Sequence, residues 1–160
     1  MSRSKADPPR RSRSNASETA WTLAVRWLAA RDRSSAEVHR RLEAAGVEST
    51  LVEATLQRLR NLGYVDDTRF ASSYAEMAAR RGHGSERVRS ELEARGVNRE
   101  AVEAAIGNSF ENERELAQRA LARHQTKPPT TANERARAAR FLLNRGFPEA
   151  VVLAIIGEGC

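Results

Sequence analysis

The sequence predicts an all-α protein of three tandem three-helix repeats, about nine helices in all, forming an elongated, curved array. The first observation is an internal repeat, because residues 35–56 match residues 85–106 at ten of 22 positions without a gap. The second is that apolar residues recur at i, i+4 and i+7, the spacing of one helix face. The third is that no segment alternates between apolar and polar residues over the length of a strand.

A shift of 50 residues brings one leucine and one glycine of each repeat into register: Leu42, Leu92 and Leu142, and Gly46, Gly96 and Gly146. Each glycine follows an apolar-periodic stretch, where a helix commonly ends on a residue with positive φ. These landmarks divide the chain into repeats at 19–66, 67–110 and 111–160. A unit of about 50 residues has little core of its own, so we expect neighbouring repeats to share faces.

The first repeat is expected to begin with a helix over about 19–31, with Leu23 and Trp27 on its inward face. Two shorter helices follow, and each opens with a serine or threonine three residues before a glutamate, the pattern of a capping box. These pairs are Ser34 with Glu37 and Thr50 with Glu53. Trp21 lies off the apolar stripe of the first helix, so it is either a core residue or a surface contact, for example with a nucleic-acid base.

The second and third repeats are expected to begin with helices over 67–81 and 111–124. Their predicted inward residues are Phe70, Tyr74 and Met77 in the second repeat, and Leu116 and Ala120 in the third. Asn98 is placed to cap the last helix of the second repeat, and Pro148 to occupy the first position of the last helix. Residues 126–131 form the one long predicted loop.

Half of the excess positive charge lies near the N-terminus. The chain has 27 Lys+Arg against 21 Asp+Glu, a net +6, and five cations with two acidic residues give residues 1–19 a net +3. Residues 1–18 are expected to be a disordered basic arm, because they have too few apolar groups to fold. This arm is either a solubilising tail or a segment that attracts phosphates at long range.

The sequence has no recognisable catalytic, metal or cofactor motif. The three histidines share neither a helix face nor a ligand spacing: His39, His83 and His124. The single cysteine, Cys160, cannot form an intramolecular disulfide. The chain also lacks a glycine-rich phosphate loop and an apolar run of the ~20 residues that a membrane span needs. We therefore expect a cytoplasmic protein that is not an enzyme and uses no cofactor.

Several arginines recur with the repeat, and stacking would place them in rows on one surface. Three pairs lie one repeat of 50 residues apart, namely Arg31 and Arg81, Arg87 and Arg137, and Arg95 and Arg145, and Arg40 and Arg140 lie two repeats apart. Such rows could bind phosphates or carboxylates through paired hydrogen bonds. The alternative is a solvated face on which the arginines pair with nearby glutamates. The candidate contact residues are Arg31, Arg81, Arg87, Arg137, Arg40 and Arg140.

The segment joining the first repeat to the second resembles the signature of the RecX family, regulators of the recombinase RecA. Its matching residues are Gly63, Tyr64, Asp66, Asp67, Phe70, Ala71 and Tyr74. Weaker matches at 33–38, 84–88 and 141–147 extend the resemblance over about residues 20–156. The adjacent acidic residues Asp66 and Asp67 either cap the following helix or contact a partner.

The resemblance implies a non-catalytic regulator that binds RecA, as a monomer or as a nucleoprotein filament. Such a protein modulates, and mostly inhibits, the ATPase, strand-exchange and coprotease activities of RecA in homologous recombination, DNA repair and the SOS response. It implies no catalytic residue, no membrane partner and a monomeric chain, with weak direct contact to DNA. The alternative is a helical repeat protein that binds nucleic acid directly, and its affinity would fall steeply with salt.

Overall fold

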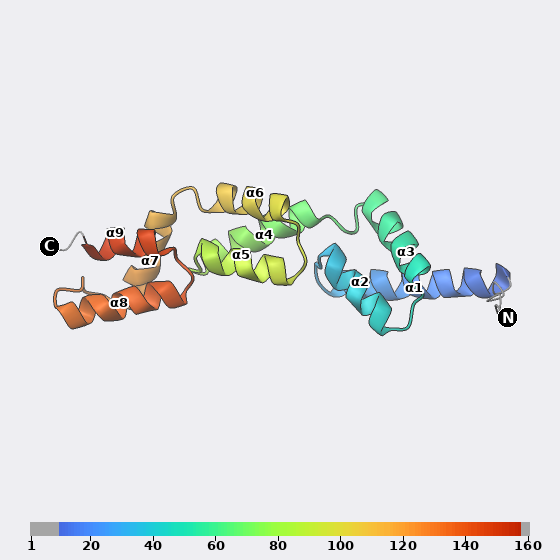
Figure 1. Ribbon diagram of the computed structural model, residues 1–160, viewed down its shortest axis with the longest axis horizontal. Coiled ribbons are helices and arrows are strands. Elements are labelled where there is room, and N and C mark those ends of the chain that lie inside the picture. The colour runs from blue at the N-terminus through green and yellow to red at the C-terminus, as the bar shows by residue number, and fades with distance from the viewer. Residues whose placement is uncertain (1–9, 158–160) are drawn as a thin grey trace, which may run out of the picture. The chain divides into compact units, whose positions relative to one another are not determined.

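The computed structural model describes residues 10–157. Within this range the chain forms nine α-helices and no strand (Figure 1). They are α1 (Arg10–Ala30), α2 (Ser35–Ala44), α3 (Ser49–Asn61), α4 (Asp67–Arg80), α5 (Ser85–Ala94), α6 (Arg99–Ser109), α7 (Glu113–His124), α8 (Ala132–Asn144) and α9 (Glu149–Gly157). The prediction of an all-α helical repeat is confirmed.

The chain divides into two compact units, Met1–Asp66 and Asp67–Cys160. The first contains α1 to α3 around one apolar core that includes Leu42, Leu56 and Leu59. The second contains α4 to α9 and has two cores, one among α4 to α6 and one among α7 to α9. Leu116 of α7 packs against both of these cores, so the second and third helix triplets share a residue between them.

Helix α1 begins earlier than the sequence predicted. Its first residue is Arg10, so residues 10–18 are helical and not a disordered arm, and residues 1–9 of that arm lie outside the described residues. The Thr19 hydroxyl donates a hydrogen bond of 2.9 Å to the Asn15 carbonyl within this segment. Once a helix is nucleated by its packed part, each added residue gains a backbone hydrogen bond at little cost, so the extension needs no core of its own.

The inward face of α1 is made of smaller residues than predicted. Ala20 and Ala24 are fully buried, whereas Trp27 is only partly buried against the core and Leu23 is not among the residues that pack there. Alanines let a helix backbone approach its neighbours closely, and the larger side chains then cover the edges of the contact. In α4 the predicted Phe70 is buried and Tyr74 packs beside the core, but Met77 does not belong to that cluster.

Most of the predicted caps are present. Ser34 and Glu37 form the full capping box at α2, and the Asn98 side chain accepts a hydrogen bond of 2.9 Å from the Ala101 amide at α6. The expected box at Thr50 is wrong, because α3 begins at Ser49 after Glu48, which makes no side-chain cap. Likewise α9 begins at Glu149, so Pro148 precedes the helix and does not occupy its first position.

The predicted glycine ends and the long loop are confirmed. Gly46, Gly96 and Gly146 have φ of 82°, 75° and 88° after α2, α5 and α8. The loop between α7 and α8 contains the predicted segment 126–131. A second capping box, formed by Thr131 and Glu134, closes this loop onto α8.

Candidate basic interface on the second and third repeats

The second and third repeats are joined where the C-terminal end of α8 meets the N-terminal end of α5. The Gly84 amide donates to the Arg145 carbonyl at 2.8 Å, and the Glu86 amide donates to the Gly146 carbonyl at 3.0 Å. These bonds satisfy amides that the first turn of a helix otherwise leaves without partners. A Cβ on Gly84 would overlap the Gly146 carbonyl and the Phe147 nitrogen, so this approach requires glycine.

Glu113, the first residue of α7, completes this junction. Its two carboxylate oxygens accept hydrogen bonds from the Ser85 amide at 2.7 Å and the Ser85 hydroxyl at 2.8 Å. Burial raises the pKa of Glu113, against the opposing effect of the hydrogen bonds from Ser85. The Gly84, Ser85 and Glu86 amides at the start of α5 thus all bond to the third repeat. We name Gly84, Ser85, Glu86, Glu113, Arg145 and Gly146 the inter-repeat junction.

Beside the junction lies a small basic pocket of about 170 Å³. Its lining residues, which we name the arginine pocket, are Arg81, Gly82, Ala120, Arg123, His124, Phe141 and Arg145. The Phe141 ring stacks on His124, with 3.9 Å between the centroids, and the guanidinium carbon of Arg145 lies 5.3 Å from its centroid. The Arg123 guanidinium donates to the Arg80 carbonyl at 3.3 Å, so two of the three arginines are held by neighbouring groups.

Within residues 10–157 the pocket arginines, unlike their neighbours, have no carboxylate partner. In the same unit Arg80 pairs with Glu76 at 3.1 Å, and Arg119 pairs with Glu115 at 3.3 Å. Among the residues that the structure describes, no ion pair joins the three pocket arginines to an acidic side chain. The positive charge also affects His83. Burial is the largest cause that lowers the pKa of His83, and the cations Arg87, Arg145 and Arg81 lower it further.

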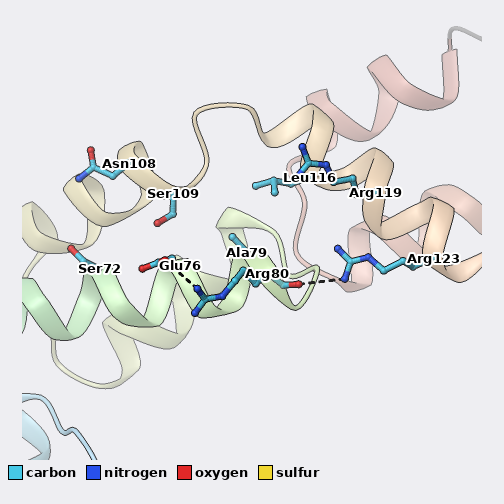
Figure 2. A pocket seen from close by; sticks show the side chains of 9 residues that line it. All are labelled: Ser72, Glu76, Ala79, Arg80, Asn108, Ser109, Leu116, Arg119 and Arg123. Carbon is cyan, nitrogen blue, oxygen red and sulfur yellow. Dashed lines mark hydrogen bonds and ion pairs between the residues drawn. The ribbon is translucent and has the colours of Figure 1, made fainter.

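A larger surface groove of about 780 Å³ lies between α4 and α7 (Figure 2). Ala79 and Leu116 give it apolar lining, and polar side chains come from the α4, α6 and α7 walls: Ser72, Glu76, Arg80, Asn108, Ser109, Arg119 and Arg123. We name this hollow the α4–α7 groove. It shares Arg123 with the arginine pocket, so the two adjoin on the same unit.

The structure places the predicted contact arginines on the surface in both units. Arg31 follows α1 and Arg40 lies on α2, both in the first unit, while their repeat partners Arg81 and Arg140 belong to the second. In the second unit Arg87 on α5 donates to Glu91 at 2.8 Å, and Arg137 on α8 is exposed. The rows themselves stay a prediction. Arg123 was missed because its repeat equivalents are not arginines, although its place in the last turn of a predicted helix was visible.

The signature residues around the first turn of α4 have structural roles. Gly63 has φ of 77° after α3, Asp67 begins α4, and Phe70 and Ala71 are buried in its core. The Tyr74 hydroxyl donates a hydrogen bond to the Glu91 carboxylate of α5, and burial raises the pKa of this tyrosine. Asp66 lies directly before α4, at the predicted cap position.

Trp21 lies in an aromatic group of the first unit. Its ring packs partly against the core and meets the Tyr64 ring edge-on at 5.7 Å between centroids. The guanidinium carbon of Arg58 lies 3.9 Å from the Trp21 ring centroid, so cation and ring attract each other. Trp21 is therefore both a core neighbour and partly accessible, and Tyr64 stays 47% exposed.

The described residues contain no group of three or more acidic, histidine or cysteine side chains that could hold a metal. His39 contacts Glu43 at 3.5 Å and Glu53 at 3.2 Å, and His124 stacks on Phe141. Cys160 lies outside the described residues. Across residues 10–157, no helix combines the length and apolar character needed to cross a membrane.

Two family models match the chain. The model of the first three-helix domain of RecX covers residues 20–59, and that of the second covers residues 66–106. The chain is 36% identical to the regulatory protein RecX of Xanthomonas axonopodis pv. citri, across 87% of this chain and 86% of the relative. It is 38% identical to the regulatory protein RecX of Pseudomonas syringae pv. tomato, across 76% and 79%. The crystal structure of RecX from Lactobacillus salivarius has the same fold, with a TM-score of 0.75 at 20% identity, across 91% of this chain and 97% of that one.

Proposed function

The chain belongs to the RecX family of regulatory proteins. We propose that it regulates the recombinase RecA by binding RecA and its filament on DNA. Binding modulates, and mostly inhibits, the ATPase, strand-exchange and coprotease activities of RecA. The protein would thus act in homologous recombination, DNA repair and the SOS response. The single observation that carries the proposal is the family match over both the first and the second three-helix domain.

The surface of the second unit supports a regulator that works by contact. The α4–α7 groove has apolar lining from Ala79 and Leu116 with arginines beside it, a combination suited to a protein partner that carries acidic residues. Exposed arginines at Arg137 and Arg140 of α8 add positive charge on the same unit. We propose that these residues, with Arg31, Arg40, Arg81 and Arg87, contact the filament.

We propose a monomer in the cytoplasm, where RecA acts, with neither a cofactor nor a reaction of its own. Regulation by contact requires only that the chain bind one state of RecA more tightly than another. The family has no accepted catalytic residues, and the second unit has acidic and basic groups that pair with each other, such as Arg80 with Glu76.

The proposal is tested by co-sedimentation of the chain with RecA filaments assembled on long single-stranded DNA, at low and at moderate salt. We expect the chain to sediment with the filament at both salt concentrations, and far less with bare DNA at moderate salt. If sedimentation with the filament were no greater than with bare DNA and fell log-linearly with salt, direct nucleic-acid binding would replace regulation of RecA as the function.

A further inference from the structure

We propose that the arginine pocket is a binding site for a single phosphate group. Its three arginines come from the C-terminal ends of three different helices. Arg81 directly follows α4, Arg123 lies in the last turn of α7, and Arg145 directly follows α8. No carboxylate in the described part of the chain pairs with any of them, whereas Arg80 and Arg119 next to the pocket are both paired.

The charge of the pocket exceeds what the helix ends need. Cations at a helix C-terminus are favourable because the aligned peptide dipoles leave roughly −0.5 elementary charge there. Three such ends amount to roughly −1.5 charges, against three guanidiniums that each carry a full positive charge. About half of the positive charge is thus left for a ligand, and a phosphate would neutralise it.

The shape of the pocket also suits a tetrahedral anion. A volume of about 170 Å³ is well above the ~10–15 Å³ that one ordered water molecule needs, which leaves room for a phosphate with part of its hydration. Gly82 has no side chain and Ala120 has only a methyl group, so these two lining residues take up little of the space. Three guanidiniums from separate helices can each donate to a different oxygen, whereas one carboxylate offers only two oxygens in a plane.

Two of the arginines are held in position before any ligand arrives. Arg145 lies over Phe141, whose other neighbour is the stacked His124 ring, and Arg123 donates to the Arg80 carbonyl. The inter-repeat junction fixes α8 against α5 through the Gly84 and Glu86 amides. Donors that are already ordered lose less conformational entropy when they bind an anion.

This inference does not depend on the proposed function, because the phosphate could belong to a nucleic-acid backbone or to a free nucleotide and neither requires RecA. The direct test follows the arginine Nε–Hε signals of the ¹⁵N-labelled full chain by NMR during titration with inorganic phosphate. Single Arg→Lys variants assign the signals while preserving charge. We expect the signals of Arg81, Arg123 and Arg145 to shift together and to saturate, while the paired Arg80 and Arg119 shift little.

Chloride at matched ionic strength is the control, and separate titrations with (dT)₈ and with ATP distinguish the sources. Movement of the same three signals by (dT)₈ alone assigns a backbone phosphodiester, and movement by ATP alone assigns a free nucleotide; either outcome supports the site. Parallel, non-saturating shifts of all exposed arginines, or equal shifts with chloride, would overturn it.

A binding assay on variants gives a second, independent readout. The pocket variant combines Arg123→Gln with Arg145→Gln. The control variant combines Arg99→Gln with Lys127→Gln and so removes the same charge outside the pocket. The affinity of both for a labelled (dT)₂₀ strand is measured over a salt series. If the backbone supplies the phosphate, the pocket variant should bind at least several-fold more weakly, with a salt slope smaller by ~0.7, the share of one single-strand phosphate. Thermal melting verifies that both variants are folded. If NMR has assigned the site to a backbone phosphate, equal salt slopes of (dT)₂₀ binding in the two variants would contradict that assignment.

Discussion

Ser34 and Gly84 occupy equivalent positions in the first two repeats, yet they complete the first turn of their helices in different ways. Ser34 caps α2 with its own hydroxyl, which accepts from the Glu37 amide at 3.2 Å. Gly84 has no side chain, and the amides of the α5 turn bond instead to Arg145, Gly146 and Glu113 of the third repeat. One missing side chain thus converts a self-contained helix start into a contact between repeats.

Gly84→Ala should destabilise the second unit by about 1–3 kcal/mol, the usual cost of forcing extra atoms into a packed position. The backbone at Gly84 has φ of −91°, which alanine adopts without strain, so the main cost comes from the overlap with Gly146 and Phe147. The control is Gly107→Ala on α6, where a Cβ meets nothing within 4 Å and helix propensity improves. Thermal or urea unfolding measures the stability of both variants. If Gly84→Ala were as stable as the wild type, the junction would not form.

Replacing Glu113 should distinguish hydrogen bonding from charge at the junction. Glu113→Ala leaves the buried Ser85 amide and hydroxyl without this partner and should cost about 1–3 kcal/mol. In Glu113→Gln the side-chain carbonyl oxygen can still accept from the Ser85 amide, and the NH₂ group can donate to the Ser85 hydroxyl oxygen. This variant should therefore lose less stability than Glu113→Ala. Urea unfolding of the two variants beside the wild type gives the difference.

The same residue predicts a pH dependence. Because the pKa of Glu113 is raised in the folded chain, its protonated form is favoured there, and its contribution to stability is greatest below its ordinary value of 4.5. That contribution should decline as the pH rises through the raised pKa. The free energy of unfolding of the wild type, relative to that of Glu113→Gln, should therefore fall from pH 4 to pH 7. A rise over this range would contradict the prediction.

Individual helices are largely encoded by local signals, and this explains what the sequence could and could not predict. The capping box at Ser34, the cap at Asn98 and the glycine end at Gly146 each depend on residues within one turn, and all three are present. The start of α1 was missed because a helix extends beyond its packed part without an apolar pattern. The junction and the arginine pocket join residues far apart in the chain, such as Gly84 and Arg145, and no local pattern encodes that contact.

The start of α8 depends on the charge of Glu134. The amides of Thr131 and then Thr130, with the Thr130 hydroxyl, donate to the Glu134 carboxylate and lower its pKa to about 2. A lowered pKa means that the charged form stabilises the fold above the ordinary value of 4.5, and that this contribution is lost as the pH falls toward about 2. Glu134→Gln should therefore lower the melting temperature at pH 7 and have little effect near pH 2; an equal effect at both would show that charge plays no part.

The chain consists of two units with separate cores, divided between Asp66 and Asp67. The second unit is held together by the inter-repeat junction and by Leu116, which packs against both of its cores. Its surface carries a groove, a basic pocket and exposed arginines, and such features suit contact with a macromolecule better than enclosure of a small substrate.

Charge reversal tests whether the exposed arginines of α8 contact the filament. Arg137 and Arg140 are three residues apart, so they are neighbours on one helix face. Arg137→Glu with Arg140→Glu should weaken filament binding about tenfold or more, equivalent to ~1.4 kcal/mol. The variant Arg99→Glu with Lys127→Glu has the same net charge and should bind more like the wild type. Equal binding by the two variants in co-sedimentation would show that the α8 arginines are only a solvated face.

Regulation of RecA by this chain is tested by the DNA-dependent ATPase rate of RecA on single-stranded DNA, titrated with the chain at two salt concentrations. Inhibition should saturate well below one chain per RecA molecule and persist at the higher salt. An ATPase rate that never changes, together with salt-sensitive binding of the chain to bare DNA, would contradict it.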